Sequence, residues 1–211
     1  MSSAPLGSSA PLGSSAPLDL RSRTIGEYLD RLAAAVPVPG GGAVAGVTLA
    51  QANALGAMVV GYAIGKPKFA AHDAAHRAAH ASFERGRQRA LDLAAQDASA
   101  YAALNALWKL PKDDPSRAGF ADAVIAAIAA PEATLLLAKD TLVGTTSPSL
   151  ASDLRIALDL VLSGASAAQE NVRINLPSVA DEPLRGRVSA RTEAVLAEIS
   201  AGVKAALARL P

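Results

Sequence analysis

The run of residues 42–64 carries no charged side chain and consists mostly of Ala, Gly, Val and Leu. An apolar segment of this length is long enough to cross a bilayer. It nevertheless contains the polar residues Thr48, Gln51 and Asn53, and it has no Trp to anchor it at a membrane surface. The run therefore predicts a long helix buried in a protein core, and not a membrane span.

Small residues recur every four positions along this run, which aligns them on one helix face. Such a stripe lets a second helix approach closely. About half of the chain is hydrophobic but only 3% is aromatic, so Ala, Leu and Val must build the core. Since no segment shows the sustained alternation of a strand, we expect an all-α, multi-helix bundle around a long buried Ala/Gly-rich central helix. The stripe comprises Gly42, Gly46, Ala50 and Ala54.

Three consecutive glycines stand where the central helix should begin, within the sequence Pro-Val-Pro-Gly-Gly-Gly-Ala at 37–43. Glycine allows a tight turn and a close approach of the backbone to a ligand. The N–H groups of a helix N-terminus and its dipole favour an anion or a polar ring edge. Gly40, Gly41 and Gly42 are therefore candidate binding residues, and Lys66 and Lys68 form a basic cluster at the other end of the run.

Residues 2–18 repeat Ser-Ser-Ala-Pro-Leu-Gly with a period of six. The segment has neither a basic start nor a continuous apolar core, so it does not read as a signal peptide. Its composition cannot bury enough surface to offset the entropy of ordering. We expect a low-complexity flexible tail over residues 1–22 and one helical domain over residues 23–211.

Turn and capping signals divide the remainder into helices. Thr24 and Glu27 fit a capping box, and residues 68–107 read as one very long helix or as two with a bend near Gly86. Pro131 is expected to open a further helix, and the last one should span residues 182–209. Trp108 is most simply a packing anchor.

The net charge of +1 gives no bulk electrostatic support for a nucleic-acid partner. The absence of Cys excludes disulfides and thiolate metal sites within this sequence and leaves the compartment open, with the cytoplasm as the default. His72, His76 and His80 form a ladder at intervals of four, and two such His can bind a metal. No cluster of carboxylates completes a site, so we interpret the ladder as a solvated helix face and expect no metal.

Several polar residues have the spacing expected of residues that share a catalytic or binding site. Asp97 and Tyr101 are four apart and share a helix face, where they fit a base and a hydrogen-bond donor, although an exposed Asp and a core-edge Tyr are the simpler interpretation. Asn171 and Asn175 are also four apart, near a predicted helix end where Asn commonly caps. Asp153 fits a second carboxylate or a helix N-terminal charge.

Several motifs together resemble the cyclodeaminase/cyclohydrolase family of folate enzymes. They are the Pro-x-Pro-Gly-Gly-Gly turn, the downstream Gly-Lys at 65–66, and Asp-Ala-Ser-Ala-Tyr at 97–101. The others are Leu-Pro-Lys at 110–112, Pro131, Ser-Asp at 152–153 and Asn-Val-Arg-Ile-Asn-Leu at 171–176. The resemblance covers about residues 24–180 and implies a helical homodimer that acts on a one-carbon-substituted tetrahydrofolate without metal or other cofactor.

The resemblance assigns roles to the candidate residues. Asp97 would be the base, Lys66 and Tyr101 would be donors, and the Gly40–Gly42 turn would shape the pterin pocket. The remaining substrate-binding candidates are Pro39, Lys68, Asp153, Asn171 and Asn175. The function we expect is methenyltetrahydrofolate cyclohydrolase. The alternatives are formiminotetrahydrofolate cyclodeaminase and a non-catalytic helical oligomerisation module.

Overall fold

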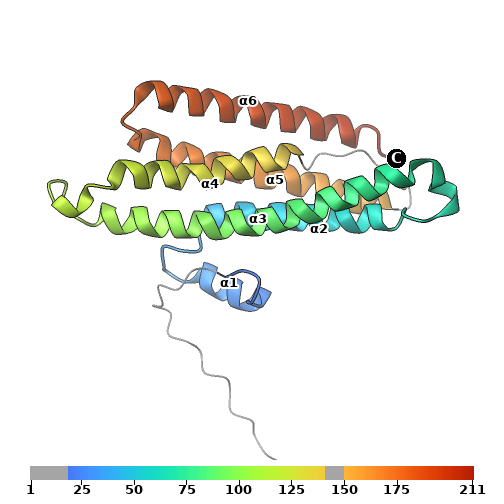
Figure 1. The fold of residues 1–211 in the computed structure, drawn as a ribbon, viewed down its shortest axis with the longest axis horizontal. Helices are drawn as coiled ribbons and strands as arrows, with labels where there is room; N and C mark the ends of the chain where they lie inside the picture. The colour runs from blue at the N-terminus through green and yellow to red at the C-terminus, as the bar shows by residue number, and fades with distance from the viewer. Residues whose placement is uncertain (1–18, 141–149) are drawn as a thin grey trace, which may run out of the picture.

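The computed structural model describes residues 19–140 and 150–211, and within these ranges every regular element is helical (Figure 1). The all-α prediction is therefore confirmed. The elements in chain order are α1 (Ile25–Ala33), α2 (Gly41–Gly61), η1 (Pro67–His72), α3 (Asp73–Trp108), η2 (Pro115–Arg117), α4 (Phe120–Asp140), α5 (Ala151–Asn175), η4 (Leu176–Ser178) and α6 (Glu182–Leu207).

The predicted central helix is α2, which packs mainly against α3 and α5. Leu49, Ala45 and Ala52 are at most 1% exposed and belong to the largest hydrophobic cluster. By length and composition α2 could cross a membrane, with a mean hydropathy of 1.6, but 61% of its most apolar window is buried inside the bundle. This burial is what a core helix requires.

The first two residues of the small-residue stripe, Gly42 and Gly46, bring α2 close to α3 as predicted, whereas Ala54 at its other end is exposed. A Cβ added at Gly46 would lie 2.7 Å from the Ala94 Cβ, and one added at Gly86 would overlap the Asn53 side chain. Gly86 therefore accommodates a buried amide from α2, and α3 passes through it as one continuous helix. Of the two alternatives for residues 68–107, the single long helix is the one that forms, preceded by η1.

The helices α3 and α5 both run antiparallel to α2. Gly42 faces Asp97 and Gly56 faces Phe83, so numbers rise along α2 as they fall along α3. Gly41 faces Asn171, and Gly164 contacts the backbone around Leu49, which gives the same sense for α5. The N-terminus of α2 therefore meets the middle of α3 and the C-terminal end of α5.

The sequence placed one proline wrongly. Pro131 lies inside α4 and does not begin it, because the helix already starts at Phe120. Pro131 is fully buried, as are Val124 and Thr134 on the same helix. Tertiary packing thus holds α4 in one piece through a residue that cannot donate a backbone hydrogen bond. The capping box at Thr24 and the final helix from Glu182 form as predicted.

The first described residues lie against α3. Arg21 forms an ion pair of 2.8 Å with Asp92 and donates to Gln88, while α1 lies outside the layer of long helices (Figure 1). Ile25 on α1 remains 77% exposed. The boundary expected at residue 22 stays a prediction, because residues 1–18 lie outside the described part of the chain.

Candidate functional site

The glycine segment forms the N-terminus of α2. Gly40 is the N-cap residue, with extended backbone and no side-chain cap, and Gly41 and Gly42 are the first two helical residues. The backbone N–H of Ala43 donates a hydrogen bond to the carboxylate of Asp97 on α3. A side chain from a neighbouring helix thus supplies the acceptor that an N-cap residue usually provides.

Gly42 is required by this close approach, and not by an unusual backbone angle. A Cβ at Gly42 would overlap both oxygens of the Asp97 carboxylate. The left-handed backbone region, which only glycine adopts easily, is occupied among the described residues by Gly65 alone. Gly42 therefore lets the backbone of α2 approach the Asp97 carboxylate, and the predicted approach of this backbone to a ligand stays a prediction.

Burial sets the protonation of this carboxyl group. Asp97 is 8% exposed, and desolvation raises its pKa from 3.8 to about 6 even though the hydrogen bond from Ala43 lowers it. A group with this pKa exchanges its proton readily near neutral pH, which suits a general acid or base. The simpler interpretation of Asp97 as an exposed charge is wrong.

Asn171 and Asn175 come from the C-terminal end of α5. A Cβ at Gly41 would lie 3.2 Å from the Asn171 amide, so this side chain adjoins the glycine segment. Asn171 Nδ2 donates to the Ala167 carbonyl at 2.8 Å, and Asn175 Nδ2 donates to the Asn171 carbonyl at 2.9 Å. Both amides donate to carbonyl groups of their own helix one turn earlier, and neither acts as a helix cap through these hydrogen bonds.

Tyr101 lies one turn beyond Asp97 on α3 and starts a short row of aromatic rings. Its ring centroid lies 6.1 Å from that of Trp108, which in turn lies 6.5 Å from that of Phe120. Trp108 packs between two rings yet remains 40% exposed. Pro39, before the glycines, is buried and follows a cis peptide bond.

The structure separates three predicted site residues from the others. Lys66 and Lys68 are exposed beyond the C-terminus of α2, and Asp153 lies near the N-terminus of α5, which the antiparallel packing places at the same end. The length of α2 is about 30 Å. Within one chain, Lys66 therefore does not reach Asp97.

The histidine ladder lies near that second end and is only partly solvated. His76 is 7% exposed and packs edge-on against Phe69 with ring centroids 5.9 Å apart, so the prediction of a solvated face is wrong for this residue. His72 is exposed. No group of three His, Asp or Glu in residues 19–140 and 150–211 is placed to hold a metal ion.

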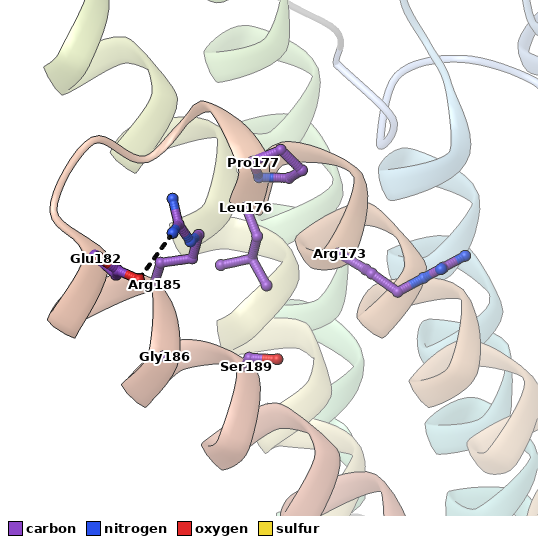
Figure 2. Close-up of a pocket in the computed structure, with 7 residues that line it drawn as sticks. All are labelled: Arg173, Leu176, Pro177, Glu182, Arg185, Gly186 and Ser189. Atoms are coloured by element: carbon purple, nitrogen blue, oxygen red, sulfur yellow. Dashed lines mark ion pairs between the residues drawn. The ribbon is translucent and has the colours of Figure 1, made fainter.

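Two depressions were not predicted from the sequence. The first, of about 570 Å³, lies where α5, η4 and α6 meet (Figure 2) and is lined by Arg173, Leu176, Pro177, Glu182, Arg185, Gly186 and Ser189. Each of its guanidinium groups has an acidic partner, Glu170 for Arg173 and Glu182 for Arg185. The second lies beneath α1. The capping box predicted this helix but gave no signal of what it covers.

Comparison with known proteins places the chain in a family. The family model described as formiminotransferase-cyclodeaminase matches residues 24–194. A formimidoyltransferase-cyclodeaminase from Sus scrofa is 31% identical over 183 residues, which are 82% of this chain and 34% of that protein. The chain thus spans about a third of the length of this relative.

Two further relatives match nearly end to end. A methenyltetrahydrofolate cyclohydrolase from Methylorubrum extorquens is 27% identical over 85% of this chain and 92% of its own length. The crystal structure of a formiminotetrahydrofolate cyclodeaminase from Thermotoga maritima superposes with a TM-score of 0.80 at 26% identity, covering 90% of this chain and 98% of that one. The chain belongs to the formiminotransferase-cyclodeaminase family, in its cyclodeaminase/cyclohydrolase domain.

Proposed function

We propose that the protein is a methenyltetrahydrofolate cyclohydrolase, which hydrolyses 5,10-methenyltetrahydrofolate to 10-formyltetrahydrofolate in one-carbon metabolism. The observation that carries the proposal is the buried Asp97 carboxyl, held against Gly42 at the start of α2 with a pKa of about 6. The likeness to the Methylorubrum cyclohydrolase over nearly its full length supports it.

Asp97 acts as the base in this proposal. It takes a proton from water as the water oxygen bonds to the amidinium carbon between N5 and N10. The adduct then loses its C–N5 bond while N5 gains a proton and the hydroxyl loses one to become the formyl oxygen. One proton is released overall, and the Asp97 carboxyl returns to its starting state.

The positive charge of the methenyl substrate determines whether a carboxylate beside it helps or hinders the reaction. The methenyl substrate is a cation that becomes neutral when water adds, so a fixed carboxylate beside it would stabilise the ground state more than the adduct. A carboxyl group that is costly to ionise limits this penalty, because it gains a proton as the substrate loses its charge. Burial of Asp97 therefore serves the reaction in addition to the fold.

The proton donors are Tyr101 from the same chain and Lys66 of the partner subunit in a homodimer. Lys66 and Gly42 stand twelve residues on either side of Ala54. Ala54, Met58 and Tyr62 are exposed along α2. Pairing two α2 helices antiparallel about Ala54 would bring Lys66 of the partner subunit level with Gly42.

The other candidates then divide between two chains. Pro39 and the Gly40–Gly42 segment shape the pterin pocket, and Asn171 and Asn175 bind the substrate from α5 of the same chain. Lys68 and Asp153, which share an end of the bundle with Lys66, would reach the same pocket from the partner subunit. We assign no metal or other cofactor to this reaction and place the enzyme in the cytoplasm.

The second candidate function is formiminotetrahydrofolate cyclodeaminase. The Sus scrofa and Thermotoga relatives, which carry cyclodeaminase names, favour it. In that reaction N10 attacks the formimino carbon and Asp97 takes the N10 proton. The amino group of the adduct then gains a proton, and its C–N bond breaks to release ammonia and give the methenyl compound. The same pocket and base would serve, with an amine in place of water.

An absorbance assay with purified protein tests both functions. Loss of the near-ultraviolet band of 5,10-methenyltetrahydrofolate, faster than in protein-free buffer, would support the cyclohydrolase. No acceleration, together with appearance of that band from 5-formiminotetrahydrofolate, would support the cyclodeaminase instead. No reaction with either substrate would contradict both and favour a non-catalytic helical module.

A further inference from the structure

The turn that follows α2 carries Lys66 and is held by a carboxylate from the next long helix. Asp73 is the first residue of α3, and its Oδ1 accepts a hydrogen bond of 2.7 Å from the backbone N–H of Gly65. This bond spans eight positions of the chain and joins the turn to the start of α3. Asp73 therefore acts on the backbone immediately before Lys66.

Gly65 has a backbone conformation that needs such support. Its φ is 72°, in the left-handed region, whereas a Cβ added to it would meet no atom of the described residues within 4 Å. Glycine is therefore required at this position by the backbone angle and not by a lack of space. Since no neighbouring side chain packs over Gly65, the hydrogen bond to Asp73 is the contact that fixes the course of the chain into Lys66.

The backbone of Lys66 is held on both sides, while its ammonium group is available. Its N–H donates to the Ala63 carbonyl at 3.3 Å, and its carbonyl accepts from the Phe69 N–H at 2.9 Å. The ring of Phe69 packs edge-on against the buried ring of His76 on α3. Within residues 19–140 and 150–211, the exposed Lys66 side chain has neither a hydrogen bond nor an ion pair. Lys66 thus combines a fixed backbone with an uncommitted proton donor.

Both oxygens of the Asp73 carboxylate have donors. Arg77, one turn further along α3, donates from Nε to Oδ2 at 2.7 Å. The hydrogen bond from Gly65, followed by the one from Arg77, lowers the pKa of the Asp73 carboxyl and keeps it ionised. Because each oxygen is already occupied, Asp73 holds the turn without drawing the Lys66 ammonium into an ion pair.

We propose that Asp73 is a positioning residue for Lys66. It fixes the left-handed turn at Gly65 and so sets the backbone from which the Lys66 side chain reaches the reacting nitrogen. The inference rests on the proposed function, in which Lys66 of the partner subunit donates a proton to the substrate. A donor that acts across a subunit boundary needs a rigid base, because a displacement of about 1 Å lowers turnover about a hundredfold.

Steady-state kinetics and amide hydrogen exchange of the full chain test this role. Asp73→Ala removes the acceptor, so the Gly65 amide should exchange faster and kcat should fall at least about tenfold, with KM within about threefold of the wild type. Asp73→Asn keeps an oxygen that accepts from Gly65 and should restore kcat to within about threefold.

Asp181→Ala is the matched control. It also removes a carboxylate that accepts a backbone N–H at a helix start, that of Leu184 at 2.9 Å, but on α6, which packs against α4 and α5. It should keep the kcat of the wild type. Thermal unfolding of all the variants checks that Asp73→Ala and Asp181→Ala are folded and lose similar stability.

A double variant tests whether the effect passes through Lys66. In a chain with Lys66→Ala no donor is left to position, so adding Asp73→Ala should change the residual single-turnover rate by less than about twofold. A substitution that only weakened the fold would lower the rate by the same factor in both backgrounds.

The outcomes separate this inference from the function itself. Loss of kcat and of Gly65 protection in Asp73→Ala, recovery in Asp73→Asn and no further loss beside Lys66→Ala would support the positioning role. An active wild type whose Asp73→Ala variant has the kcat of Asp181→Ala would overturn the role and leave the function standing. An equal loss of rate with and without Lys66 would do the same. A wild type that turns over neither folate would overturn the function and this role together.

Discussion

The carboxylate of Asp97 fills the space beside Gly42 that the side chain of any other residue at position 42 would need. The same carboxylate accepts a hydrogen bond from Ala43, the next residue of α2. One helix start thus supplies both the room for a buried acid and the N–H group that holds it. The buried position of Asp97 therefore depends on the absence of a side chain at Gly42.

Substitution of Gly42 by Ala should damage the site more than the fold. The added methyl group must displace the Asp97 carboxylate, which costs about 1–3 kcal/mol of stability through overpacking. Displacement by about 1 Å should lower turnover about a hundredfold. Thermal unfolding and the absorbance assay measure the two effects.

Gly186→Ala is the matched control for this substitution. Gly186 also lies in a helix, but a Cβ there has nothing within 4 Å. Its replacement should leave turnover unchanged and raise stability by up to about 1 kcal/mol through helix propensity. Turnover of Gly42→Ala equal to that of Gly186→Ala would show that the contact with Asp97 has no part in the reaction.

The pH dependence of turnover should follow the ionisation of Asp97. A base must be deprotonated, so kcat/KM should fall below an apparent pKa of about 6 in the free enzyme. The bound cationic substrate favours the carboxylate, so the pKa seen in kcat should lie lower than the one seen in kcat/KM. Steady-state rates over pH 5–8, corrected for spontaneous hydrolysis, test this order.

Asp97→Asn is the matching variant. It should lower kcat by about 10²–10⁴-fold while the affinity for the folate stays within a few-fold. The acid limb near pH 6 should disappear from what activity remains. Wild-type turnover in this variant, or an unchanged acid limb, would mean that another group is the base.

The sequence predicted the fold well because its strongest signals are local. An uncharged run, a four-residue stripe of small side chains and a capping box each depend on near neighbours in the chain, and α2 and α1 follow from them. Pro131 shows the limit of such rules. Its effect on α4 depends on packing against other helices, which no local pattern reveals.

The sequence indicated which residues are candidates for the site, but it did not indicate which of them lie close together. Asp97 and Gly42 are far apart in sequence, and only the antiparallel packing of α2 and α3 brings them together. Lys66 belongs to the same sequence motif as the glycines, yet the length of α2 separates the two ends. Nothing in the sequence indicated the depression beneath α1, which Arg23 and Tyr28 line, because its walls come from three separate helices.

The buried acid should also leave a signature in protein stability. Between about pH 4 and 6 the folded protein holds a proton on Asp97 that the unfolded chain has already lost, so this group makes stability fall as pH rises. The wild type should lose about 2 kcal/mol of stability relative to Asp97→Asn between pH 4 and 6, and less than about 0.5 kcal/mol more by pH 7. Urea unfolding of both proteins at pH 4, 5, 6 and 7 measures the difference. A difference that does not change with pH would contradict the raised pKa.

Mixing two inactive variants tests whether the site is shared between subunits. If Lys66 acts from the partner subunit, Asp97→Asn and Lys66→Ala should each be nearly inactive alone. A mixed dimer of the two would hold one site with both residues intact. After co-refolding in equal amounts, half of the dimers are mixed and about a quarter of the wild-type activity should return. Mixing each variant with itself is the control. If the mixture stays as inactive as its components, although light scattering shows that dimers form, Lys66 does not complete the site across subunits.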